Sequence, residues 1–267
     1  MTSRGRLLAV LNGELPDCVP VMPDTSNMIP ARLTGKPFWD LYLYNDPPLW
    51  EAYVECVKHF DIDSLMDGYF PLTCPPPPEA GPQPRWERWI VLRNDERIVT
   101  QRATIENGER VWSGTVDVYY VADPPTGGLP VEKLGLPRVP DDPQPLEGVR
   151  PVDTGPEGLR RMKRLMGEQG LVGVFVIGSC ALGNTEAVYN YYDHPELHEQ
   201  WARERVVEAE RRFEYVMSLE EKPDFLCVGG SGALVFQTVE IFRQLAFPAV
   251  RRVIELATEA GFPTHVH

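Results

Sequence analysis

The run Leu171-Val172-Gly173-Val174-Phe175-Val176-Ile177, followed by Gly178-Ser179-Cys180, decides the fold class of this chain. An unbroken apolar run of this length is typical of a strand that is covered on both faces, as the strands of parallel sheets are. We therefore predict a buried strand over residues 171–177. The loop that begins at Gly178 then lies at the carboxyl end of this strand.

Helical patterns and apolar strands alternate along most of the chain. Helical spacing covers residues 3–13, about 37–44, 47–60 and 155–168, about 195–219 and about 237–258. Four further segments are predicted to be buried strands, and these are Val19–Met22, Ile62–Met66, Asp224–Val228 and Thr264–His267. Five parallel strands separated by helices predict the α/β class, as a βα barrel or a doubly wound sheet.

A second kind of pattern interrupts this alternation between about residues 72 and 150. The proline run at 75–78 breaks regular structure, and three strand-like runs follow it at Trp86–Leu92, Arg97–Ile105 and Val111–Val121. Asn107-Gly108 lies between the second and third runs, and Asn-Gly is the strongest short hairpin signal. We predict an antiparallel β meander inserted into the α/β chain.

The amino-acid composition limits the classes of binding partner that we expect. The 267 residues carry a formal net charge of −13, and no run of Lys or Arg stands out. Binding to nucleic acid or to an anionic membrane surface requires clustered cations, so neither partner is expected. No apolar stretch is long enough to span a membrane. The five cysteines are scattered and form no CxxC pair, which favours free thiols in a reducing cytoplasm.

Polar residues gather in the loops that follow the predicted strands, where both candidate folds place their sites. Asp67 follows the second strand and is the candidate general acid or base. Gly230 and Ser231 belong to a Gly229–Gly232 loop that suits an anion or, equally, a tight turn. The candidate substrate-binding residues are Asp24, Asn27, Tyr69, Asn184, Gly230 and Ser231.

The stretch Gly261-Phe262-Pro263-Thr264-His265-Val266-His267 ends in two histidines on one strand. Because strand side chains alternate between faces, His265 and His267 point to the same side. This spacing suits a metal pair, although packed or hydrogen-bonded histidines explain it as well.

The order of these motifs resembles the uroporphyrinogen decarboxylase-like superfamily, which includes methyltransferases that act with corrinoid proteins. The resemblance rests on residues 3–21, on Val174–Ser179, His194–Glu196 and Pro223–Val228, and on Gly261-x-Pro263-x-x-x-His267. It implies a (β/α)₈ barrel, and so a single incomplete barrel domain over residues 1–267 with about five of eight βα units. Roughly three further units, on the order of 80–100 residues, are then expected outside this sequence.

The resemblance also implies an activity. In the methyltransferase branch the strand ending at the position of His267 continues His-x-Cys, and that pair binds zinc with a later Cys. His267 is therefore an expected zinc ligand, His265 a neighbour, and the remaining ligands would follow residue 267. A zinc-dependent methyltransferase acting with a corrinoid on a partner protein and a small methyl donor or acceptor is expected. The alternatives are a metal-free decarboxylase of uroporphyrinogen or a related acid, and a non-catalytic corrinoid- or partner-binding fragment. A homodimer is also compatible with the sequence.

Overall fold

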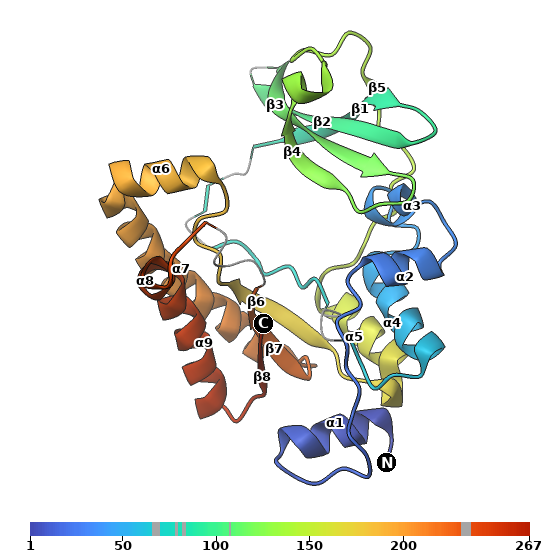
Figure 1. Ribbon diagram of the computed structural model, residues 1–267, viewed down its shortest axis with the longest axis vertical. Coiled ribbons are helices and arrows are strands. Elements are labelled where there is room, and N and C mark those ends of the chain that lie inside the picture. The colour runs from blue at the N-terminus through green and yellow to red at the C-terminus, as the bar shows by residue number, and fades with distance from the viewer. Residues whose placement is uncertain (66–69, 78–79, 82–83, 107, 231–235) are drawn as a thin grey trace. The chain divides into compact units, whose positions relative to one another are not determined.

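The chain divides into two compact units. The computed structural model describes residues 1–65, 70–77, 80–81, 84–106, 108–230 and 236–267. Unit 1 consists of Met1–Pro23, Asp61–Cys74 and Thr154–His267, and unit 2 consists of Asp24–Phe60 and Pro75–Asp153. Figure 1 shows a parallel sheet with helices in unit 1 and an antiparallel sheet with helices in unit 2. The predicted mixed α/β class is confirmed.

Unit 1 is built on a parallel sheet with the strand order β6-β7-β8. The strands are β6 (Gly173–Gly178), β7 (Phe225–Gly229) and β8 (Thr264–Val266), and an isolated parallel bridge joins Phe70 to Val174. These strands lie where the apolar runs predicted them. The described residues form no closed barrel, so the sheet supports the α/β class and leaves the eight-stranded barrel a proposal.

Helices of unit 1 alternate with these strands. They are α1 (Ser3–Leu11), α5 (Pro156–Met166), α6 (Thr185–Asp193), α7 (Pro195–Ser218), α8 (Val239–Ile241) and α9 (Phe247–Glu259). The α7 and α9 helices lie against β6, and α9 also lies against β7. A single helix was predicted over 237–258, but a π-helical turn at Phe242–Ala246 separates α8 from α9. Pro248 explains the interruption, because it lacks an N–H and its ring crowds the preceding turn.

Two of the predicted strands are wrong. Residues 19–22 and 62–65 form no strand, and Met66 lies outside the described residues. Val19 is 85% exposed, and Pro20 has no N–H to donate to a ladder. The two segments meet instead through Asp63, whose N–H donates to the Val21 carbonyl (2.9 Å) and whose carboxylate accepts from the Val21 N–H (2.7 Å).

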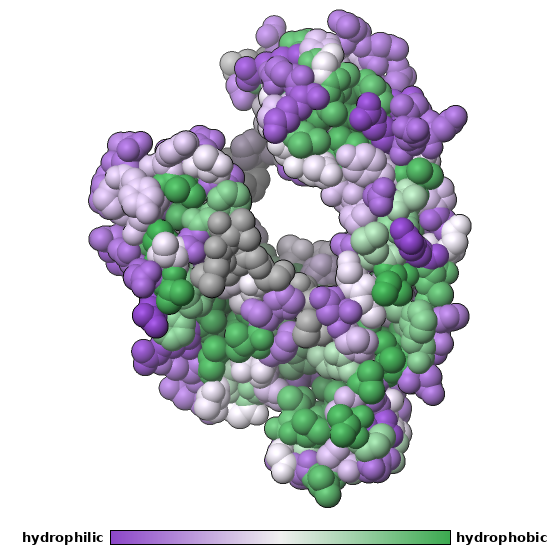
Figure 2. Space-filling view, viewed as in Figure 1, coloured by the Kyte–Doolittle hydropathy of each residue, from purple (hydrophilic) through white to green (hydrophobic). Residues whose placement is uncertain are grey.

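Unit 2 contains the predicted meander. Its strands β1 (Trp86–Arg93), β2 (Arg97–Glu106) and β3 (Glu109–Tyr120) pair antiparallel. Two further strands, β4 (Thr126–Pro130) and β5 (Gln144–Pro145), complete the order β4-β3-β2-β1-β5. Figure 2 shows hydrophobic side chains in the middle of this sheet and hydrophilic ones around its rim. The helices of unit 2 are α2 (Met28–Leu33), α3 (Phe38–Tyr42) and α4 (Leu49–Phe60).

No helix in the described part of the chain combines the length and the apolar character that crossing a membrane requires.

Candidate functional site at the strand ends of unit 1

The carboxyl ends of β6, β7 and β8 are joined by backbone hydrogen bonds that continue beyond the ladder. The Ser179 N–H donates to the Gly229 carbonyl (3.2 Å), and the Gly230 N–H donates to the His267 carbonyl (3.0 Å). His267 in turn donates its N–H to the Val228 carbonyl (2.9 Å). Two of the predicted site residues, Gly230 and His267, are therefore direct neighbours.

Gly229 makes this close approach possible. Its φ is +98°, a conformation that residues with a side chain rarely adopt. A Cβ atom added to it would lie 2.5 Å from the His267 carbonyl oxygen. The glycine is thus required for the position of His267, and not only for a turn.

Three potential metal donors lie on one face of β7 and β8. Cys227 pairs with His265 in the parallel register, and Cys227 Sγ lies 3.7 Å from His265 Nδ1. The His265 and His267 rings are edge to face, with centroids 6.2 Å apart. The predicted placement of the two histidines on one side is confirmed. The Cys227 thiol was missed, because only the strand register brings it to His265.

The His265 imidazole is held in its neutral form. Burial lowers its pKa below the usual value, and the neighbouring His267 lowers it further. A neutral imidazole has a lone pair available for a metal ion or a proton donor. Because Phe225 packs edge to face on the same ring (centroids 6.3 Å apart), the imidazole is fixed in orientation as well.

The donor types and one distance fit zinc. In a tetrahedral site with ordinary Zn–S and Zn–N bonds, a sulfur and a nitrogen ligand lie about 3.6 Å apart. The 3.7 Å between Cys227 Sγ and His265 Nδ1 matches such an edge. Among the described residues, no group of three His, Cys, Asp or Glu side chains is arranged around a common metal position. The described residues therefore fit zinc at two ligand positions, Cys227 and His265, and His267 lies next to them.

The loop after β6 is held by Ser179 and by Gln237, and the sequence did not single out Gln237. Gln237 donates its amide to the Ser179 carbonyl (3.0 Å) and accepts from the Ala181 N–H (3.0 Å). Ser179 Oγ donates to the Gly230 carbonyl (3.2 Å), which ties the loops after β6 and β7 together. The sequence shows only a glutamine after a glycine-rich segment, whereas its burial, which makes both ends of the amide need partners, is seen in the structure.

Arg205 on α7 also reaches this loop. It donates to the Gly178 carbonyl, and its guanidinium carbon lies 4.6 Å from the centre of the Trp201 ring. Its Nε is buried with no hydrogen-bond acceptor in the described structure, and no described carboxylate pairs with it. Burial, followed by the charge of Arg212, lowers the pKa of Arg205. The arrangement places a cation beside the strand ends, with no counter-charge among the described residues.

The other predicted site residues have varied positions. Asn184 is the N-cap of α6, where its side-chain oxygen accepts from the Ala187 N–H (2.8 Å). Asp24 and Asn27 belong to unit 2, where Asp24 Oδ1 accepts from the Ser26 N–H (2.6 Å) and Asn27 immediately precedes α2. The positions predicted to carry the general acid or base and further substrate contacts, namely Asp67, Tyr69 and Ser231, lie outside the described residues.

A charged cluster at the opposite end of the sheet serves stability. Asp224, which directly precedes β7, forms a two-pronged ion pair with Arg4 (2.6 and 2.9 Å) and lies 3.2 Å from Lys163. It also accepts from the Val172 N–H at 2.8 Å. Burial by itself raises the pKa of Asp224, but these hydrogen bonds and charges outweigh it and leave the pKa below its usual value. The cluster fixes the entries to β6 and β7.

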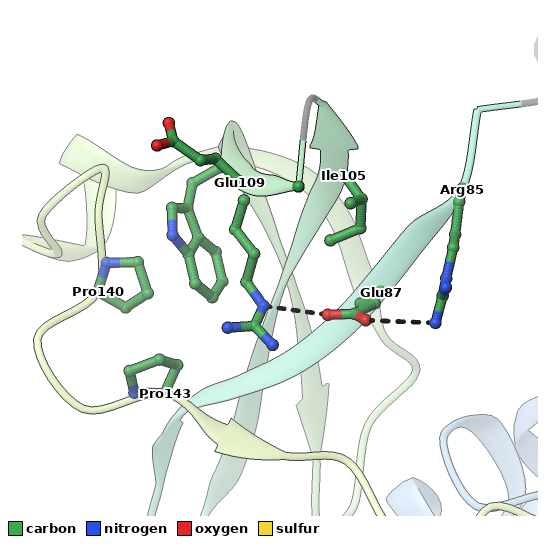
Figure 3. Close-up of a pocket in the computed structure, with 9 residues that line it drawn as sticks. Arg85, Glu87, Ile105, Glu109, Pro140 and Pro143 are labelled. Atoms are coloured by element: carbon green, nitrogen blue, oxygen red, sulfur yellow. Dashed lines mark hydrogen bonds and ion pairs between the residues drawn. The ribbon is translucent and has the colours of Figure 1, made fainter.

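Unit 2 has a separate hollow of about 550 Å³ at one edge of its sheet (Figure 3). Pro140, Pro143 and Trp112 are among its lining residues, and Arg85 and Arg110 both pair with Glu87. The Arg110–Glu87 pair is 3.1 Å long and lowers the pKa of Glu87. The lining holds two arginines, Arg85 and Arg110, and two carboxylates, Glu87 and Glu109, so its charges balance.

Comparison of the chain with family models, with curated proteins and with solved structures found no match.

Proposed function

We propose that this chain is a uroporphyrinogen decarboxylase-like enzyme that transfers methyl groups with zinc, acting with a corrinoid cofactor or corrinoid protein. The observation that carries the proposal is the Cys227–His265 contact, with His267 on the same face at the strand ends. The alternation of parallel strands and helices in unit 1 supports a barrel of this kind.

Each residue has a definite part in this proposal. His267 and the Cys227–His265 pair are the candidate zinc ligands, and Gly229 holds the His267 backbone in place. Zinc, when bound, keeps an acceptor thiol deprotonated at neutral pH while leaving it nucleophilic. The Ser179–Gly230 and Gln237 contacts fix the loops that would line the substrate position.

The test of this activity is methyl transfer from a methylated corrinoid to a small thiol. We expect turnover that a chelator abolishes and that added zinc restores. Replacement His267→Ala should lower the rate at least tenfold, whereas His59→Ala, on α4 of unit 2, should not. A protein that binds the methylated corrinoid without turnover would be a binding protein, which contradicts the proposal.

Arg205 favours a second candidate, a metal-free decarboxylase of uroporphyrinogen or a related acid. A substrate carboxylate would supply the counter-charge that Arg205 lacks among the described residues. Decarboxylation that resists chelators and that Arg205→Met abolishes would establish this alternative. Loss of activity on chelation would exclude it.

A further inference from the structure

Two arginines face each other on neighbouring strands of unit 2. Arg88 on β1 pairs directly with Arg102 on β2, and both side chains lie on the same face of the sheet. Their guanidinium carbons lie 5.8 and 4.9 Å from the centre of the Trp86 ring. Like charges placed opposite each other destabilise a sheet, so this arrangement needs an opposing charge.

Within the described structure, these two arginines are only weakly paired with a negative charge. Asp117 is the carboxylate near both arginines, at 3.6 Å from Arg88 and 3.8 Å from Arg102. Both distances exceed hydrogen-bonding range, and Asp117 already accepts from the Gly128 N–H (3.1 Å). Neither guanidinium donates a hydrogen bond to another described residue, and Arg88 Nε is buried without an acceptor.

The face of the sheet that carries Arg88 and Arg102 is open to solvent at one end. The α3 helix and its C-terminal flank cover the part of this face that carries Ile90, Ile98 and Tyr119. Beyond them, the Trp86 residue is 53% exposed and the Arg102 side chain 54%, whereas the Arg88 side chain is only 23% exposed. A small ligand can therefore enter past Trp86 and Arg102 and reach the recessed Arg88.

The opposite face of the same sheet provides the contrast. Arg110 also lies over a tryptophan, with its guanidinium carbon 4.3 Å from the Trp89 ring centre. Its Nε donates to Glu87 at 3.1 Å, so its charge is met inside the protein. An arginine stacked on a tryptophan is therefore not by itself an anion-binding site. The difference is that the Arg88–Arg102 pair has guanidinium donors with no acceptor among the described residues.

We propose that Arg88 and Arg102 bind the oxyanion of a small molecule, a carboxylate or a phosphate, between their guanidinium groups. Guanidinium forks match the geometry of these anions and bind them with two parallel hydrogen bonds. Trp86 holds the guanidinium groups of both arginines in position by cation–π contact. The proposal goes beyond the proposed function, since it requires neither zinc nor the residues of unit 1.

The test is calorimetric titration of the whole protein with inorganic phosphate and, separately, with acetate, against chloride at constant ionic strength. Nuclear magnetic resonance of the arginine Nε–H groups reports which arginines respond. We expect at least one of the two oxyanions to bind above the chloride background. The one that binds more tightly shows whether the natural ligand carries a phosphate or a carboxylate. Arg102→Met should weaken it at least tenfold, and Arg88→Lys should weaken it by keeping charge without the fork.

Arg110→Met is the matched control, because it removes an arginine from a tryptophan on the other face, and it should leave the affinity within twofold. Arg102 is half exposed, so its replacement should fold even if a variant at Arg88 does not. Equal heats for phosphate, acetate and chloride would overturn the proposal. Unchanged affinity in Arg102→Met, or an equal loss in Arg110→Met, would overturn it as well.

Discussion

Cys227 Sγ and His265 Nδ1 lie 3.7 Å apart across the β7–β8 ladder. The contact joins a buried thiol to an imidazole whose pKa is lowered by burial, so the imidazole is neutral at physiological pH. Neutral imidazole and thiolate are the forms in which these side chains bind zinc. The same two groups would otherwise be a satisfied hydrogen bond within the sheet, and experiments must separate the two interpretations.

The first prediction concerns the ion cluster around Asp224. Asp224→Ala should lower the free energy of unfolding by about 3 kcal/mol, because it removes the buried carboxylate that pairs with Arg4 and that accepts from the Val172 N–H. Urea denaturation measures the change. Asp17→Ala is the control, since its ion pair with Arg6 is exposed to solvent and should contribute much less. Equal losses in the two variants would contradict the account.

A pH dependence follows from the same carboxylate. The folded-state pKa of Asp224 is below its unfolded value, so its stabilising effect is present above about pH 4 and is lost as pH falls through the folded-state pKa. Asp63, whose pKa is also lowered although burial opposes it, should act in the same direction. Acid titration of the unfolding free energy should be less steep in Asp224→Asn than in the unchanged protein. Identical slopes would show that Asp224 does not titrate on unfolding.

Gly229 should tolerate no side chain. Gly229→Ala combines a φ of +98° with a Cβ that would meet the His267 carbonyl oxygen, so we expect a loss of more than about 2 kcal/mol in unfolding free energy. Gly178→Ala is the control, because its Cβ would meet Phe175 at an ordinary 3.5 Å. Thermal unfolding compares them, and a similar small change in both would show that the close approach to His267 is not needed.

Asn184 is predicted to be a helix cap whatever else it contacts. Asn184→Ala should cost about 1 kcal/mol, because the Ala187 N–H loses its acceptor. Asn184→Asp keeps an oxygen in that place and should retain the stability. If both variants lose the same amount, the cap is not the source of the effect. A change in substrate affinity in Asn184→Asp, at unchanged stability, would support the substrate-binding role expected from the sequence.

Local patterns predicted the elements well where burial and turn chemistry agree. The apolar run at 171–177 became β6, and the alternation of the meander became β1, β2 and β3. Val19–Met22 failed because apolar letters do not report burial, and Val19 is exposed in a segment interrupted by Pro20. A hydrophobic run predicts a strand only when a neighbouring strand can accept its hydrogen bonds.

The site was harder to predict than the elements. His265 and His267 share a face because side chains alternate along a strand, and their spacing of two residues is visible in the sequence. Cys227 joins them only through the register of β7 and β8, and Arg88 meets Arg102 only through that of β1 and β2. Register between strands depends on packing across the whole sheet, and a single sequence does not specify it.

The central claim, a zinc site at Cys227, His265 and His267, is tested most directly by metal binding to the purified protein. Cobalt(II) is titrated in place of zinc, and thiolate ligation is read from its sulfur-to-metal charge-transfer absorption. We expect this absorption in the unchanged protein, its loss in Cys227→Ser, and at least tenfold weaker binding in His267→Ala. Cys180→Ser and His59→Ala, which change residues outside the cluster, should bind as the unchanged protein does. Absence of the absorption, or its persistence in Cys227→Ser, would contradict the account.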